Sequence, residues 1–277
     1  MRTIQEFESW NTAHTPLNVE SWKIRLVGFT EYTDIIQGIS SGFKLGVQNR
    51  EVLQSSEGSH GSNNLWEVIK KEVNLNRLLG PFTSPPLEDF QISPVQAIPK
   101  NTPGKFRFIH NLSAPHNHSM NDAIPEGLKS VSYCKISEVV DTLLRSGWRA
   151  AVLAKVDLKD AFRMVPIHRG DWGYLGMKVD NLYFINSVLP MGCGTSCAIF
   201  QKFTRALCWI AKKELPELHI FEYLDDFLLV SKDFKSAELH LTHFINMCKD
   251  LGVPISEKKN GGPISIYCFL GGGFRYS

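Results

Sequence analysis

Apolar and polar positions along the chain repeat with two periods, one typical of helices and one of strands. In four segments the apolar residues recur every three or four positions, which predicts helices with one buried face. These segments are 65–73, 136–144, 199–210 and 237–251, and shorter helices are indicated over 19–26 and 33–39. Stop signals follow three of the four, at Gly80-Pro81, Gly147 and Gly252.

Shorter apolar runs predict strands. Residues 91–100 and 105–111 favour two strands joined by a turn that contains Pro103 and Gly104. The run 150–157 ends in an acid and predicts a buried strand. Residues 220–230 favour a hairpin with a tight turn. The order strand, helix, hairpin, helix, strand predicts an α+β fold with an antiparallel sheet and packed helices.

The centre of that last hairpin carries two adjacent acids, Asp225 and Asp226. Two carboxylates inside an apolar segment are costly unless a cation neutralises them. An isolated Asp-Asp pair is usually a surface turn, but Asp157 also ends an apolar strand. A strand end beside a hairpin tip can gather three carboxylates, which is a pattern that holds divalent ions for phosphoryl transfer. Taken alone, Asp157 would instead be read as the N-cap of a helix over 158–164.

The amino-acid composition limits the class of protein but does not identify the function. The 277-residue chain is 43% hydrophobic and 21% charged, as in ordinary globular proteins. A net charge of +2 means that any nucleic-acid binding must come from local patches. Six scattered cysteines, no secretory signal and no membrane-length apolar run favour an intracellular protein of the cytoplasm or nucleus with reduced thiols.

Histidines offer a second candidate for metal binding. His110, His116 and His118 lack a cysteine or acid at ligand spacing, so a polar loop is favoured over a metal site. His240 and His243 lie on the last amphipathic helix and are expected at its surface or boundary.

Several segments, taken in order, resemble the motifs of reverse transcriptases. The segment 155–162 resembles their first palm motif, and Tyr223-Leu224-Asp225-Asp226 resembles their YxDD motif. Residues 93–109 resemble the fingers hairpin, 189–201 the segment between the palm motifs, 251–259 a later palm motif and 269–271 the start of the primer grip. Segments 15–19, 42–46 and 189–193 are most similar to DIRS/Ngaro-type retrotransposons.

The resemblance implies a right-hand polymerase with fingers over 61–132 and 165–192 and a palm over 133–164 and 193–277. Residues 1–60 would form an N-terminal extension. The chain stops soon after 271, so we expect no thumb and no RNase H domain. The implied activity is RNA-directed DNA polymerisation, with an RNA or DNA template, a primer and deoxynucleotides as partners and no membrane. The oligomeric state is not indicated.

The resemblance also assigns roles to individual residues. Asp157, Asp225 and Asp226 would bind two Mg²⁺ ions, with Mn²⁺ as an alternative, and the Leu158 carbonyl would add a ligand. Lys259 would protonate the leaving pyrophosphate, with an exposed lysine as the simpler interpretation. The residues expected to contact the nucleotide are Lys100, Lys105, Arg107, Phe162, Met191 and Gly192.

Among these residues, Phe162 is the expected steric gate against a 2′-hydroxyl, although a phenylalanine there could also be a core residue. Arg107 alternates with Phe106 and Phe108 and is therefore expected to face away from them.

Two other functions remain open. A non-catalytic remnant of a retroelement would fold and at most bind nucleic acid. A palm-type nucleotide cyclase or RNA polymerase would share the metal chemistry, but a gate against the 2′-hydroxyl at Phe162 would be out of place in either.

Overall fold

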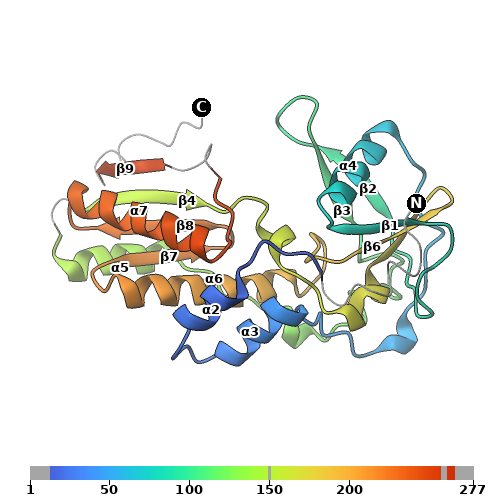
Figure 1. Ribbon diagram of the computed structural model, residues 1–277, viewed down its shortest axis with the longest axis horizontal. Helices are drawn as coiled ribbons and strands as arrows, with labels where there is room; N and C mark the ends of the chain where they lie inside the picture. The colour runs from blue at the N-terminus through green and yellow to red at the C-terminus, as the bar shows by residue number, and fades with distance from the viewer. Residues whose placement is uncertain (1–12, 149–150, 257–260, 266–277) are drawn as a thin grey trace. The chain divides into compact units, whose positions relative to one another are not determined.

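The computed structural model describes residues 13–148, 151–256 and 261–265, which combine helices with antiparallel sheets (Figure 1). This confirms the α+β class. The described residues divide into two compact units. The first unit comprises 13–15, 36–130 and 162–199, and the second comprises 16–35, the described part of 131–161, and the described residues from 200 onward. Helices α3 (Tyr32–Ser41) and α6 (Ser196–Glu214) contribute to both units.

The first unit contains a three-stranded sheet in the order β1-β6-β5 and a two-stranded sheet β2-β3. Its elements are α4 (Asn63–Asn74), β1 (Leu78–Phe82), β2 (Val95–Pro99), β3 (Phe106–His110), β5 (Gly176–Val179), β6 (Leu182–Asn186) and the short 3-10 helices Arg50–Val52, Glu126–Leu128, Ala161–Met164 and Arg169–Leu175. The hairpin β5-β6 had no counterpart in the sequence prediction.

Helix α4 covers part of the first unit's core. The Ser62 side chain accepts a hydrogen bond from the Leu65 backbone N–H at 3.2 Å and so caps the helix. Leu65 and Ile69 then pack in one cluster with strand residues such as Phe184. The helix ends at Asn74, so the predicted stop at Gly80-Pro81 was wrong. That dipeptide lies in β1, an edge strand with an irregular register, where a proline is tolerated.

The hairpin β2-β3 confirms the two strands predicted over 91–100 and 105–111. Its ladder runs from the pair Val95 and His110 to the pair Pro99 and Phe106. The turn closes with a hydrogen bond from the Lys100 backbone N–H to the Lys105 carbonyl at 2.8 Å. Both strands have a free edge in a sheet of two, which suits Pro94 and Pro99.

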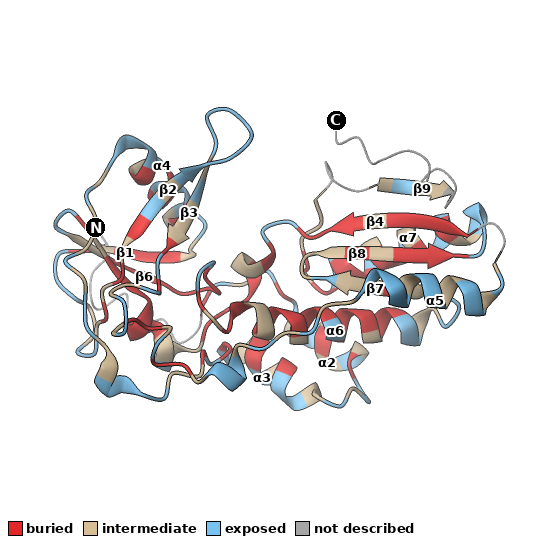
Figure 2. Cartoon of the chain, turned by 180° about the vertical axis from the view of Figure 1, so that it is seen from behind, coloured by how far each residue is buried: buried red, intermediate tan, exposed pale blue. Residues whose placement is uncertain are grey.

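The second unit is built on a four-stranded antiparallel sheet in the order β7-β8-β4-β9. The strands are β4 (Val152–Asp157), β7 (His219–Tyr223), β8 (Asp226–Ser231) and β9 (Gly261–Ser265). The unit also contains α2 (Val19–Arg25), α5 (Ile136–Ser146), α7 (Phe234–Asp250) and most of α6. The two central strands are the most buried, as Figure 2 shows.

Helices pack on both faces of this sheet. On one face Phe244 of α7 meets Phe227 of β8, with ring centroids 5.2 Å apart. On the other face Leu143 of α5 packs against a cluster that contains Leu153 and Val230. Successive residues of these central strands therefore pack against different helices.

Two of the predicted helix stops are confirmed. Helix α5 ends before Gly147 (φ 65°), and Gly252 (φ 73°) follows the end of α7. A Cβ on Gly252 would lie 2.0 Å from the Pro16 carbonyl oxygen, so close approach as well as the left-handed backbone requires glycine there.

Two histidine predictions were wrong. His240 is buried, and its Nδ1 hydrogen-bonds the Ser231 hydroxyl at 2.8 Å. His110 is a buried residue of β3 and not part of a polar loop. The partner of His240, Ser231 of β8, is not revealed by the local sequence pattern. The exposed His116 does fit the expected loop.

Five cysteines lie in the described part of the chain, and all five are free thiols. Cys193, Cys208 and Cys248 are buried, and burial raises the pKa of each thiol above its ordinary value. Cys268 is outside the described residues. Within the described segments, none of the helices combines the length and the hydrophobicity needed to span a bilayer.

The buried His110 predicts an acid-sensitive fold. Burial lowers the pKa of His110 from 6.5 to about 3, and the nearby Arg163 guanidinium acts in the same direction. Below pH 6.5 the unfolded chain therefore binds a proton that the native chain does not. The free energy of unfolding should fall by about 1.4 kcal/mol per pH unit from this group as pH drops towards 3.

Denaturant unfolding of the native chain and of His110→Gln between pH 6 and pH 4 measures this contribution. In the variant, the slope of the free energy of unfolding against pH should be smaller by the amount that one bound proton contributes. His116→Gln, at an exposed position, is the matched control and should keep the native slope. Equal slopes for the native chain and His110→Gln would contradict the prediction.

Candidate functional site

The acids predicted from the sequence sit on the tight hairpin of β7 and β8. Tyr223 and Asp226 form the last pair of the ladder, which leaves Leu224 and Asp225 as a two-residue loop. This confirms the hairpin. Leu224 has φ 55°, a left-handed conformation that leucine disfavours. The Asp225 carbonyl accepts a hydrogen bond from the Leu158 backbone N–H at 2.9 Å, which ties the loop to the end of β4.

Asp157 is the last residue of β4 and lies directly opposite Asp226 in the β4-β8 ladder. Directly opposed residues of antiparallel strands project to the same face, so the two side chains are neighbours. The exposed fraction of Asp157 is 4%. The N-cap interpretation was wrong, because the chain after Asp157 makes a turn and only Ala161–Met164 is helical.

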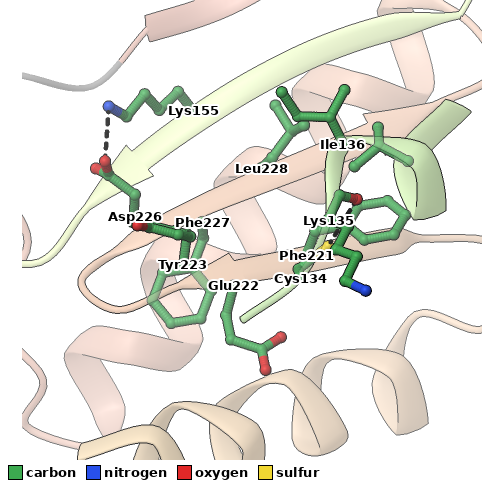
Figure 3. A pocket seen from close by; sticks show the side chains of 11 residues that line it. Cys134, Lys135, Ile136, Lys155, Phe221, Glu222, Tyr223, Asp226, Phe227 and Leu228 are labelled. Atoms are coloured by element: carbon green, nitrogen blue, oxygen red, sulfur yellow. Dashed lines mark hydrogen bonds and ion pairs between the residues drawn. The ribbon is translucent and has the colours of Figure 1, made fainter. Parts of the chain in front are cut away.

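A lysine that sequence analysis did not single out completes this group. Lys155 lies two positions before Asp157 on β4 and therefore projects to the same face. Its Nζ is 3.0 Å from the Asp226 Oδ2 (Figure 3). The exposed fractions of the two side chains are 23% for Lys155 and 39% for Asp226. Strand alternation in the segment 155–157 was the signal that could have found it.

The other oxygen of Asp226 fits a cation. Oδ1 is buried and has no hydrogen-bond partner among the described residues. A buried carboxylate oxygen without a partner is costly, and a divalent ion would satisfy it. Within the described segments, no three histidine, cysteine or acidic side chains are already gathered as a metal site.

A pocket of about 450 Å³ adjoins Asp226 and is lined mainly by apolar side chains. Its walls come from the start of α5, the hairpin β7-β8 and Lys155 of β4 (Figure 3). Tyr223 packs against Tyr133, with ring centroids 4.9 Å apart. Glu222 is also engaged with α6, where the Cys208 thiol donates to its Oε2 at 3.6 Å.

The basic residues predicted to bind phosphate lie on the hairpin β2-β3 of the first unit. Lys100, Lys105 and Arg107 are all exposed. Arg107 alternates with Phe106 and Phe108, and Phe108 packs against the core cluster. The expectation that Arg107 faces away from the phenylalanines is therefore confirmed.

Gly192 meets a requirement that the sequence analysis did not foresee. Its φ is 112°, and a Cβ would lie 2.6 Å from the His110 carbonyl oxygen. Asn121 holds the same turn, since its Nδ2 donates to the Gly192 carbonyl at 2.8 Å. The protein's own backbone thus demands glycine here, whatever binds nearby. Met191 beside it is 39% exposed.

The remaining predicted residues fall in different parts of the chain. Phe162 is half-buried in the 3-10 helix Ala161–Met164 and belongs to the first unit. Leu158 is buried at the end of β4 in the second unit. Lys259 lies outside the described residues. The structure therefore sets Asp157 opposite Asp226, with Asp225 in the adjoining loop and the Lys155 ammonium beside Asp226.

Comparison with known proteins identifies the class to which this arrangement belongs. A family described as "Reverse transcriptase (RNA-dependent DNA polymerase)" matches residues 98–262, more than half of the chain. The matched part contains β4 and the β7-β8 hairpin with all three acids. The chain belongs to the reverse transcriptase family.

Three relatives show the range of similar proteins. The Gag-Pro-Pol polyprotein of squirrel monkey retrovirus is 31% identical over 111 residues, 38% of this chain and 6% of the polyprotein. The transposon Tf2-3 polyprotein of Schizosaccharomyces pombe is 27% identical over 121 residues, 44% of this chain and 9% of the polyprotein. The genome polyprotein of Petunia vein clearing virus is 30% identical over 159 residues, 56% of this chain and 6% of the polyprotein. The matches thus cover less than a tenth of these relatives.

The close approach at Gly192 predicts a strong effect of one methyl group. Gly192→Ala should destabilise the chain by about 1–3 kcal/mol more than Gly104→Ala does. Gly104 is the matched control, because its φ is +71° but no atom lies within 4 Å of a built Cβ. Denaturant unfolding of both variants gives the comparison. Equal destabilisation would show that the His110 carbonyl imposes no constraint.

Proposed function

We propose that this chain is an RNA-directed DNA polymerase domain that transfers a deoxynucleotide to a primer 3′-hydroxyl. The observation that carries the proposal is the register of β4 and β8, which sets Asp157 opposite Asp226 with Asp225 in the adjoining turn. Membership of the reverse transcriptase family supports the same chemistry. The substrates are a template of RNA or DNA, its primer and a deoxynucleoside triphosphate.

Asp157, Asp225 and Asp226, together with the Leu158 carbonyl, would hold two Mg²⁺ ions, or Mn²⁺ in their place. When bound, such ions activate an attacking oxygen and stabilise the leaving one. The Oδ1 of Asp226 is buried without a hydrogen-bond partner in the described part of the chain, and Asp157 is almost fully buried, which supports this assignment. The chain's own part is to fix the carboxylates on two paired strands, so that little reorganisation is needed.

Residues of the first unit would select and orient the nucleotide. Arg107 and the lysines Lys100 and Lys105 would bind the triphosphate, with Arg107 suited to two parallel contacts. Phe162 would exclude a 2′-hydroxyl, and Met191 and Gly192 would line the nucleotide site. Lys259 would donate a proton to pyrophosphate, an assignment that rests on sequence alone.

We further propose that residues 61–132 and 165–192, which lie almost entirely in the first unit, form polymerase fingers, that residues 133–164 and 193–277 form the palm, and that residues 1–60 are an N-terminal extension. Within the family, segments 15–19, 42–46 and 189–193 support a DIRS/Ngaro-type origin. Retrotransposons of the DIRS/Ngaro type use a tyrosine recombinase. The test of this origin is therefore whether the genetic element that encodes the chain also encodes such an enzyme. Absence of such a gene from an intact copy of the element would contradict it.

Primer extension tests the activity directly. The native chain, given Mg²⁺, deoxynucleotides and a primed RNA template, should extend the primer. Asp225→Ala/Asp226→Ala should reduce the rate by at least about 100-fold, because the charge stabilisation at the reacting phosphate is lost. Glu217→Ala removes an exposed carboxylate of the same unit and should leave the rate unchanged.

Failure of the folded native chain to extend any primer would overturn the proposed activity. A filter-binding or anisotropy assay on the same protein would then ask whether it binds nucleic acid without polymerising.

The proposed gate predicts a change in sugar selectivity. Phe162→Val should lower the preference for deoxynucleotides over ribonucleotides by about 10–100-fold in kcat/KM. Phe90→Val alters another half-buried phenylalanine of the first unit and should keep the native ratio. An unchanged ratio in Phe162→Val would favour the interpretation of Phe162 as a core residue.

A further inference from the structure

The acids of the second unit already have a cation of the protein's own beside them. The Lys155 Nζ lies 3.0 Å from the Asp226 Oδ2, and Lys155 projects from the same face of β4 as Asp157 (Figure 3). The Lys155 ammonium therefore contacts a carboxylate that the proposed function assigns to a divalent ion.

We propose that Lys155 is an internal counter-ion that holds Asp226 in the metal-free protein and competes with the divalent ion for it. Lys155 is thus a positioning residue that sets the metal affinity of the site. The inference rests on the proposed function, because it presupposes that Asp226 is a metal ligand.

Electrostatics explain why such a counter-ion is needed. Asp157 and Asp226 are directly opposed on neighbouring strands, and like charges in that arrangement repel. Asp157 is almost fully buried, which weakens screening by solvent. An ammonium group beside Asp226 offsets part of the repulsion while no metal is bound. A divalent ion supplies more positive charge to the same carboxylates, so the two cations oppose each other's binding.

The pocket beside Lys155 leaves room for its side chain to move away from Asp226. Lys155 lies opposite Leu228 in the ladder and lines the apolar pocket of about 450 Å³. A lysine has a flexible four-carbon stem that packs along apolar surface while its ammonium group moves. When a divalent ion takes over Asp226, the stem can lie along the apolar pocket that Leu228 also lines, while the ammonium turns away from the carboxylate.

Metal binding in the absence of nucleotide and nucleic acid tests the proposal. Lys155→Met keeps an unbranched stem of nearly the same length and removes the charged ammonium group. Calorimetric titration should show that this variant binds Mn²⁺ about 3–10-fold more tightly than the native chain, as expected for loss of a half-buried competing ion pair. Its melting temperature in EDTA should fall, and the rise on adding Mn²⁺ should be larger than in the native chain.

Two control variants isolate the cause. Lys155→Arg keeps the charge and should stay close to the native affinity. Lys232→Met removes another lysine of the second unit that is also 3.0 Å from a carboxylate, that of Glu217, and should change nothing. In the Asp226→Asn background, Lys155→Met should no longer tighten Mn²⁺ binding, since the proposed competition acts through Asp226.

The outcomes separate the two proposals. Unchanged Mn²⁺ affinity in folded Lys155→Met, with a native chain that binds Mn²⁺ and extends primers, would overturn the role of Lys155 alone. Tightening that persists in the Asp226→Asn background would also overturn it. A folded native chain that neither binds Mn²⁺ nor extends primers would overturn both this inference and the proposed function.

Discussion

The register between β4 and β8 is the constraint on which the rest of the second unit depends. Six consecutive pairs run from Val152 with Ser231 to Asp157 with Asp226. Because side chains alternate along a strand, a slip of one residue would move every side chain of β8 to the opposite face. Phe227 would then leave its contact with α7, and Asp226 would leave Asp157. The packing that buries Phe227 therefore also places the two carboxylates together.

Short-range signals explain what the sequence could predict. The hairpin at 220–230, the helix stop at Gly147 and the outward direction of Arg107 each follow from neighbouring residues: an apolar run with a tight turn, a glycine at a left-handed position, and strict alternation with phenylalanines. The three acids could be singled out as candidates because two of them are adjacent at one turn and the third ends an apolar strand.

Features that depend on distant partners escaped prediction. His240 is buried because Ser231, on a different element, meets its ring. Gly80-Pro81 lies in a strand because β1 is at the edge of its sheet, which no local pattern reveals. In the sequence, Lys155 cannot be told from any other half-exposed lysine. Only the register between β4 and β8 places its Nζ 3.0 Å from the Asp226 Oδ2. Local periodicity thus defines elements, while the pairing of strands defines which charges meet.

The left-handed Leu224 has a consequence for how this chain would evolve under selection. Leucine at φ 55° costs roughly 1–3 kcal/mol relative to an unstrained backbone, and glycine would remove most of that cost. A library screened only for heat resistance should therefore enrich glycine at position 224. A library screened for polymerase activity should retain a side chain at position 224 if the bulk of that side chain limits the movement of Asp225. Divergence between the two libraries at this one position would separate the demands of folding from those of chemistry.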